Sequence, residues 1–196
     1  MKQICILGFS DKRPIVYSIT QFLQKLGTVL VVTDNRYYTA SSPTLDYETS
    51  IEDVHIAYRK DYDEKEELGF WKKEDYDFII YDFIDYVPKG PDAVIHVIDG
   101  NHNSYEYIDE MLDQIESEEC RVKNILYKPS GFKFKLGKAV SVNIESSHFL
   151  ITKNIETTGM FTQYNYKDLL RASAAILSMV LDFKEDEIYE RLVGDC

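Results

Sequence analysis

Residues 3–33 read QICILGFSDKRPIVYSITQFLQKLGTVLVVT, and this stretch decides the fold. Residues 3–8 are a short apolar run ending in glycine, which predicts a buried strand. Residues 14–26 carry apolar side chains at helical spacing, with proline in the first turn and Gly27 just past the end, as helices prefer. Residues 28–33 are a continuous, mostly β-branched run, typical of a strand covered on both faces. The stretch therefore predicts a strand–helix–strand unit.

The rest of the chain continues this alternation. Further strands are expected near 53–58, where the strand is short, at 77–82 and 92–98, which read as buried strands, and at 122–127. The further helices are expected at 104–117, about 166–183, and 185–193. Residues 36–50 are interpreted as a polar loop, and residues 60–75 as a solvated helix and loop. This order predicts an α/β fold with a mainly parallel central sheet and helices on both faces.

Residues 128–165 differ in character from the rest. Lys128 to Gly131 is a turn signal, and the alternation over 132–136 predicts a half-buried strand, with short strands near 139–144 and 148–152. Several lysines surround two phenylalanines here, on an otherwise acidic chain. Lysines on an edge strand prevent aggregation, and this interpretation is favoured over a nucleic-acid platform.

Composition narrows the class of protein. A chain of 196 residues with 44% hydrophobic residues suits one domain spanning 1–196. A net charge of −12 disfavours unspecific attraction to DNA or anionic lipid. The chain has no apolar run long enough for a membrane span and no signal-peptide pattern at its start, so a cytoplasmic location is expected. The three cysteines and four histidines show no metal-binding spacing.

The turn after the first strand, Gly8 to Pro14, is the place to look for a ligand. Ligands of open parallel sheets bind beyond the carboxyl ends of the strands. An intact phosphate loop needs glycines for close backbone approach, a lysine for charge and a Ser or Thr for magnesium. This turn keeps a glycine and Lys12 but lacks the full pattern.

The whole strand–helix–strand unit resembles that of the ParA/MinD family of P-loop proteins. That family has an apolar strand, a KGGxGKT-like loop, a helix, a glycine, and a second apolar strand with an acidic turn. Gly27 looks like the family's glycine after the helix. Counting back from it places Gly8 on the first loop glycine and Lys12 on the phosphate-binding lysine. Asp34 falls in the acidic turn.

Two later strands extend the resemblance. Residues 76–82, YDFIIYD, look like the family's YDYIIID segment, which ends in the magnesium-associated acid, and Asp82 is the matching position. Residues 92–98, DAVIHVI, resemble the next strand. The likeness covers roughly residues 3–127 and implies a P-loop NTPase-like fold.

The loop itself departs from the family pattern. Phe9 stands for the second glycine, Asp11 for the glycine before the lysine, and Arg13 for the Ser or Thr, while Leu7 falls on the signature lysine. A carboxylate at position 11 would repel bound phosphates. Arg13 lacks the magnesium-binding hydroxyl, although a guanidinium can contact phosphate itself.

The resemblance implies ATP or ADP with magnesium as cofactors, or none if the altered loop no longer binds them. The candidate nucleotide-binding residues are Gly8, Ser10, Asp11, Lys12, Arg13 and Asp34, with Asp82 as a candidate magnesium ligand. Four of them have an alternative interpretation: Lys12 and Arg13 as solvated loop charges, and Asp34 and Asp82 as turn or cap residues.

The function implied by the resemblance is that of an assembly or positioning adaptor with weak or no ATP hydrolysis. Its partner is expected to be another protein or a second copy of the chain, with nucleic acid not expected as the main partner. Two alternatives stay open. One is an active but atypical ATPase that dimerises on ATP. The other is an ATP-dependent small-molecule ligase on the same fold, which the altered loop disfavours more strongly.

Overall fold

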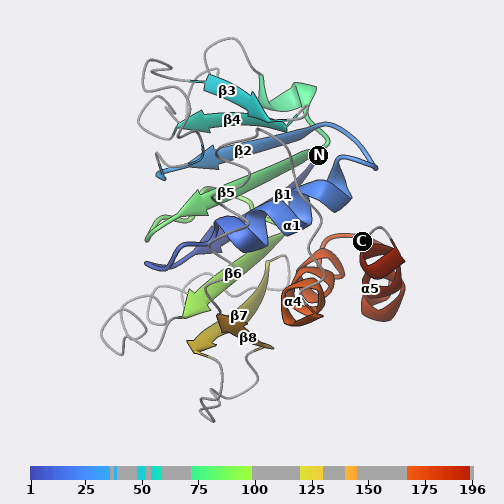
Figure 1. The fold of residues 1–196 in the computed structure, drawn as a ribbon. Coiled ribbons are helices and arrows are strands. Elements are labelled where there is room, and N and C mark those ends of the chain that lie inside the picture. The colour runs from blue at the N-terminus through green and yellow to red at the C-terminus, as the bar shows by residue number, and fades with distance from the viewer. Residues whose placement is uncertain are drawn as a thin grey trace.

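The strands of the computed structural model form one sheet. The structure describes residues 1–35, 38, 48–51, 54–58, 72–98, 120–129, 140–144 and 167–194. The strands are β1 (Lys2–Leu7), β2 (Val29–Thr33), β3 (Glu48–Ile51), β4 (Val54–Tyr58), β5 (Phe78–Phe83), β6 (Ala93–Ile98), β7 (Arg121–Pro129) and β8 (Val140–Ile144). Their order across the sheet is β3-β4-β2-β5-β1-β6-β7-β8 (Figure 1). Only β3 is antiparallel to its neighbour among these described strands.

The central strand β1 has apolar side chains on both faces. Ile4 and Ile6 belong to the core shared with the three described α-helices, α1 (Arg13–Leu23), α4 (Lys167–Leu177) and α5 (Glu185–Gly194). Cys5 and Leu7 belong to a second core on the opposite face. Figure 1 shows α1 lying across the middle of the sheet, with α4 and α5 beside it on the same side. The predicted α/β fold with a mainly parallel sheet is therefore confirmed.

Several predicted elements lie outside the described residues. These are the helix at 104–117, the strands at 132–136 and 148–152, and most of the segment 60–75. The described end of that last segment is a short 3-10 helix, η3 (Lys73–Asp75).

Three boundaries differ from the sequence-based prediction. The segment expected to be a loop, 36–50, contains the start of β3, which pairs with the edge strand β4. Strand β7 continues through Lys128 and Pro129, which were expected in a turn, because β8 pairs with it there. Helix α4 ends at Leu177, well before residue 183. Its last turn tightens, since Met179 N–H donates to the carbonyl of Ile176, three residues earlier.

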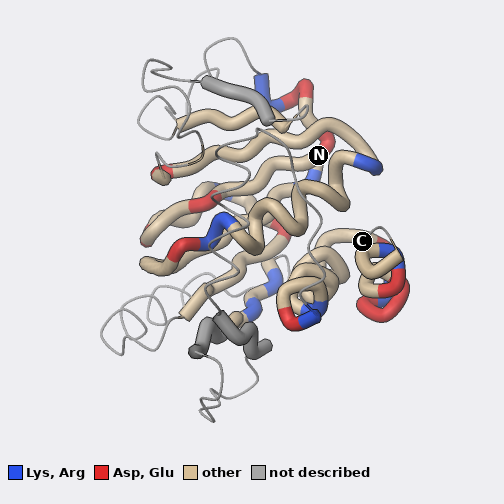
Figure 2. Tube along the Cα trace, in the orientation of Figure 1, with Lys and Arg blue, Asp and Glu red and all other residues tan. Residues whose placement is uncertain are grey.

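Helix α1 is buried along most of its length, since it lies between the sheet and α4. Figure 2 shows charge at its N-terminal end and none along its body. One buried polar contact joins the two helices: Ser173 Oγ lies 2.7 Å from Ser18 Oγ and 2.9 Å from the carbonyl oxygen of Leu169. The two hydroxyls therefore satisfy each other inside an otherwise apolar interface.

Replacing Ser173 with alanine is expected to lower the free energy of unfolding by about 1–2 kcal/mol, because Ser18 Oγ then loses its buried partner. Adding Ser18→Ala to that variant is expected to change stability by less than about 0.5 kcal/mol further, since no hydroxyl is left unsatisfied. Urea denaturation of the two single variants and the double variant checks this. Additive losses would contradict the coupling.

Gly27, the anchor of the family comparison, sits at a tight junction between β2 and β5. A Cβ there would overlap the side chain of Asp77. Asp77 Oδ2 accepts hydrogen bonds from Thr28 N–H (2.9 Å) and Thr28 Oγ1 (3.0 Å). The Thr28 backbone and hydroxyl bonds lower the pKa of the Asp77 carboxyl below its ordinary value. A glycine is needed here so that the carboxylate can approach the start of β2.

Candidate functional site

The turn after β1 lies at the carboxyl edge of the central strands. Gly8 has φ of +132°, a conformation that side chains other than glycine's rarely adopt, and a Cβ there would overlap the carbonyl oxygen of Val97 in β6. Its N–H donates to the carbonyl of Ile84, 3.0 Å away, just after β5. The turn is thus held between the two neighbours of β1.

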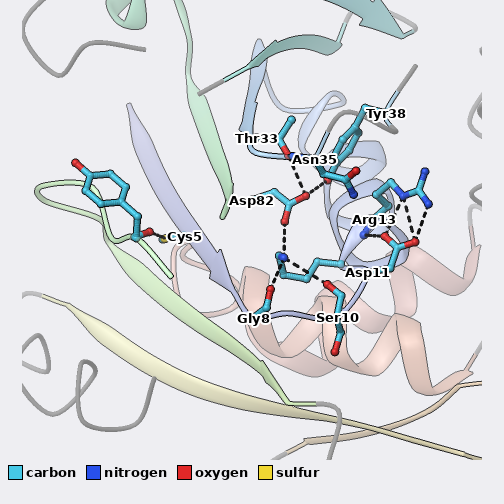
Figure 3. Close-up of polar contacts among 11 residues, drawn as sticks. Cys5, Gly8, Ser10, Asp11, Arg13, Thr33, Asn35, Tyr38 and Asp82 are labelled. Carbon is cyan, nitrogen blue, oxygen red and sulfur yellow. Dashed lines mark hydrogen bonds and ion pairs between the residues drawn. The ribbon is translucent and has the colours of Figure 1, made fainter. Parts of the chain in front are cut away.

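Figure 3 shows Gly8, Ser10 and Asp82 close together, and Lys12 Nζ contacts all three of these residues. Lys12 is only 5% exposed. Its Nζ donates to the carbonyl oxygens of Gly8 (2.7 Å) and Ser10 (3.4 Å). It also lies 3.1 Å from Asp82 Oδ1, forming an ion pair whose members are both buried. The ammonium is therefore satisfied by the protein itself.

Asp82 closes the other side of this arrangement, near the end of β5. It pairs in register with Thr33 of β2, and Thr33 Oγ1 donates to Asp82 Oδ2 at 3.2 Å. Tyr38 also donates to Oδ2, at 2.6 Å. Burial raises the pKa of the Tyr38 phenol well above its ordinary value, and the nearby Asp82 carboxylate acts in the same direction. The phenol therefore stays protonated and serves as a donor.

The two residues on either side of Lys12 pair with each other at the start of α1. Arg13 Nη2 lies 2.7 Å from Asp11 Oδ2, and Arg13 Nε lies 2.9 Å from Asp11 Oδ1. Asp11 Oδ1 also accepts the backbone N–H of Arg13 at 3.1 Å. Burial alone would lower the pKa of the Arg13 guanidinium, but the Asp11 carboxylate, together with Tyr17 and Tyr38, raises that pKa above its ordinary value. An internal carboxylate thus occupies a helix N-terminus that would otherwise attract anions.

The family resemblance implies a magnesium ion at Asp82, and the oxygen atoms there determine whether such an ion fits. Mg²⁺ requires oxygen ligands in a near-octahedral arrangement at about 2.1 Å. Asp82 Oδ2 already accepts two hydrogen bonds, and Oδ1 faces the ammonium of Lys12. In this arrangement the residues do not fit a divalent cation, since the ammonium stands where the metal charge would be. The magnesium role of Asp82 stays a prediction.

The structure brings most of the predicted site residues together. Gly8, Ser10, Lys12 and Asp82 form one contact group. Asp34 joins it through the backbone, where its N–H donates to the carbonyl of Asp82 at 3.2 Å.

The ring of Phe9 faces outward from this group. Its exposed fraction is 54%, so the ring does not fill the interior of the turn.

Two further residues, Thr33 and Tyr38, donate hydrogen bonds to Asp82 but were not predicted as site residues from the sequence. Thr33 could have been found as the hydroxyl that ends a buried β-branched run beside an acidic strand end. Tyr38 carries no such signal, because it lies in a polar stretch. It is fully buried against α1, where its ring packs edge-on against Tyr17 with centroids 5.4 Å apart.

Within the described ranges, none of the helices has the length and apolar character needed to cross a membrane. The same ranges contain no group of three or more His, Cys, Asp or Glu side chains placed to hold a metal ion.

The chain has no match in two comparisons by sequence, but it is similar in structure to solved proteins. No family model matches the sequence. The search of curated proteins also finds no match. Among solved structures, apo McdA from Cyanthece is similar with a TM-score of 0.56 and 12% identity, over 91% of this chain and 99% of that one.

Two plasmid partition proteins from Borrelia burgdorferi are more distant matches. One has a TM-score of 0.42 at 13% identity, over 100% of this chain and 99% of that one. The other, bound to AMPPNP and described as putative, has a TM-score of 0.43 at 16% identity, over 98% and 97%. The match with McdA covers nearly all of both chains. Together with the parallel sheet and the turn after β1, it shows that this chain has a ParA/MinD-like, P-loop NTPase-like fold.

Proposed function

We propose that this chain is an assembly or positioning adaptor built on a ParA/MinD-like fold, with weak or no ATP hydrolysis. The observation that supports this most is the state of Lys12. Its ammonium is buried and bound to Gly8, Ser10 and Asp82, whereas a phosphate-binding lysine must direct its charge at the ligand. The proposed role is therefore exercised through protein contacts.

The energetics favour the same conclusion. Separating a buried ion pair by removing one partner costs about 3–5 kcal/mol. A phosphate that drew Lys12 away from Asp82 would have to offset a penalty of that order. Since each 1.4 kcal/mol is a factor of about ten in affinity, the penalty corresponds to roughly two to three and a half powers of ten. Nucleotide binding at this turn is accordingly weak.

The start of α1 adds a second obstacle. A bound phosphate would meet the Asp11 carboxylate, which already accepts the N–H of Arg13. Pro14 follows and has no N–H to offer. Both changes reduce the donors that a helix N-terminus normally presents to an anion.

The partner in this proposal is a protein, either a different one or a second copy of the chain. The McdA likeness, at 12% identity, supports the fold and not a particular partner. The cytoplasmic location belongs to the same proposal. ATP and magnesium belong to the alternative of an active ATPase and rest on the family resemblance.

A loop-restored variant gives the sharpest test. The wild type is expected to show no thermal stabilisation and no calorimetric heat with ATP or ADP at about 1 mM, with or without magnesium, because Lys12 is engaged. The triple variant Phe9→Gly, Asp11→Gly, Arg13→Thr restores the two glycines and the hydroxyl of the family loop, and it is expected to bind at least tenfold more tightly. It serves as the matched positive control.

Micromolar binding of Mg-ATP by the wild type, with turnover lost in Lys12→Ala, would contradict the adaptor and favour the atypical ATPase. In that alternative Lys12 would leave Asp82 and contact the phosphates of the nucleotide. Native mass spectrometry with and without ATP separates the two further. A dimer formed only with ATP would support the ATPase, and an ATP-independent protein contact would support the adaptor.

A further inference from the structure

The environment of Lys12 Nζ is built from oxygen atoms of different parts of the fold. The turn after β1 supplies the carbonyl oxygens of Gly8 and Ser10, and β5 supplies the carboxylate of Asp82 (Figure 3). Carbonyl and carboxylate oxygens are also the donors that hard cations such as Mg²⁺ and Ca²⁺ select. The Lys12 ammonium is thus surrounded by oxygen atoms of the kind that coordinate a metal cation.

The two carboxylate oxygens of Asp82 have different surroundings. Oδ2 is held by the hydroxyls of Thr33 and Tyr38. Oδ1 is buried, and among the described residues no donor meets it at a hydrogen-bonding angle. Its close contact there is the ammonium of Lys12 at 3.1 Å. One carboxylate oxygen is therefore committed to charge neutralisation alone, as it would be beside a metal ion.

We propose that the Lys12 ammonium acts as a tethered internal cation that takes the place of a divalent metal ion at this edge of the sheet. The wild-type chain then binds no Mg²⁺ or Mn²⁺ on Asp82. Removing the ammonium opens a site for such an ion, with Asp82 Oδ1 and the Gly8 and Ser10 carbonyls as its protein ligands. This inference rests on the proposed function, because both keep Lys12 inside the fold, but it concerns metal binding without nucleotide.

The physical reason is charge balance. A carboxylate that is 1% exposed needs a compensating positive charge, and Lys12 supplies it from within the chain. A divalent ion approaching to coordination distance would be repelled by that ammonium. Because the compensating charge is part of the chain, the neutralisation of Asp82 does not depend on the concentration of a metal ion.

The test is a Mn²⁺ titration followed by electron paramagnetic resonance, with no nucleotide present. Four proteins are compared: wild type, Lys12→Met, Asp82→Asn and the double variant. Methionine keeps most of the length of lysine without its charge. Weak surface binding to an acidic chain is common to all four, so the difference made by Asp82→Asn isolates the site.

Wild type and Asp82→Asn are expected to bind Mn²⁺ alike. Lys12→Met is expected to gain a site at least tenfold tighter than the surface background, and the double variant is expected to lose it. Wild-type binding that Asp82→Asn weakens would overturn the inference. A folded Lys12→Met protein without the extra site would overturn it as well.

A second measurement on the folded wild type covers the case in which Lys12→Met does not fold. Acetylation of lysines, read by mass spectrometry, is expected to be at least tenfold slower at Lys12 than at the exposed Lys25 and Lys89. In Asp82→Asn the rate at Lys12 is expected to rise several-fold, because the ion pair no longer retains the ammonium. Equal reactivity of the three lysines in the wild type would overturn the inference.

The two proposals fail independently. A wild type that binds ATP but shows no Asp82-dependent Mn²⁺ site would contradict the adaptor and leave the internal cation intact. An Asp82-dependent Mn²⁺ site in a chain that binds no ATP would contradict the internal cation alone.

Discussion

Replacing Asp82 with alanine is expected to lower the free energy of unfolding by about 3–5 kcal/mol, the range found when one partner of a buried ion pair is removed. The variant leaves the Lys12 ammonium buried without its carboxylate, and it also removes the acceptor of Thr33 and Tyr38. Urea denaturation followed by circular dichroism measures the loss.

The double variant Lys12→Met, Asp82→Ala is the control. Because it removes both charges, it is expected to be more stable than Asp82→Ala by at least about 1 kcal/mol. A loss below about 1 kcal/mol for Asp82→Ala alone would mean that the pair is not buried as described. Additive effects of the two substitutions would mean that the two side chains are not coupled.

Gly8→Ala is expected to be the second most damaging substitution, with a loss of about 3 kcal/mol. Backbone strain at a φ of +132° contributes about 1–3 kcal/mol, since that region belongs to glycine. The added Cβ also overlaps the carbonyl oxygen of Val97, and forced overlap of this kind typically costs about 1–3 kcal/mol. Thermal or urea denaturation checks the prediction.

Gly90 provides a matched control within the same chain. Its φ is +71°, and a Cβ there would meet no atom within 4 Å among the described residues. Gly90→Ala therefore carries only the conformational penalty, about 1–2 kcal/mol. The difference between the two alanine variants measures the close approach of the turn to β6. Equal losses would show that the contact with Val97 relaxes without penalty.

The fold was predictable because its signals are local. Residues 3–8 and 28–33 are apolar runs, and the segment between them has apolar side chains at helical spacing. This pattern specifies two parallel strands joined by a buried helix. The start of β3 was missed for the opposite reason, since Glu48 to Ile51 is polar and pairs as an edge strand through its backbone. Pattern alone cannot distinguish such a strand from a loop.

The site was predictable in composition but not in arrangement. Counting along the loop selected Lys12, the likeness of residues 76–82 to a family segment selected Asp82, and the two side chains meet in the structure. The direction of the lysine depends on contacts between distant segments, which no periodicity encodes. The same holds for Asp11, which was expected to face a ligand phosphate but is neutralised by Arg13 two residues away.

The position of β1 in the sheet has a consequence for the order of folding. Strand β1 is made before both of its neighbours in the sheet, β5 ending at Phe83 and β6 ending at Ile98. Its partners are therefore absent until residues 78–98 have been made. Sheets assembled from such distant pairs have high contact order and fold slowly. The turn that carries Lys12 can reach its native shape only after β5 has brought Asp82 into place.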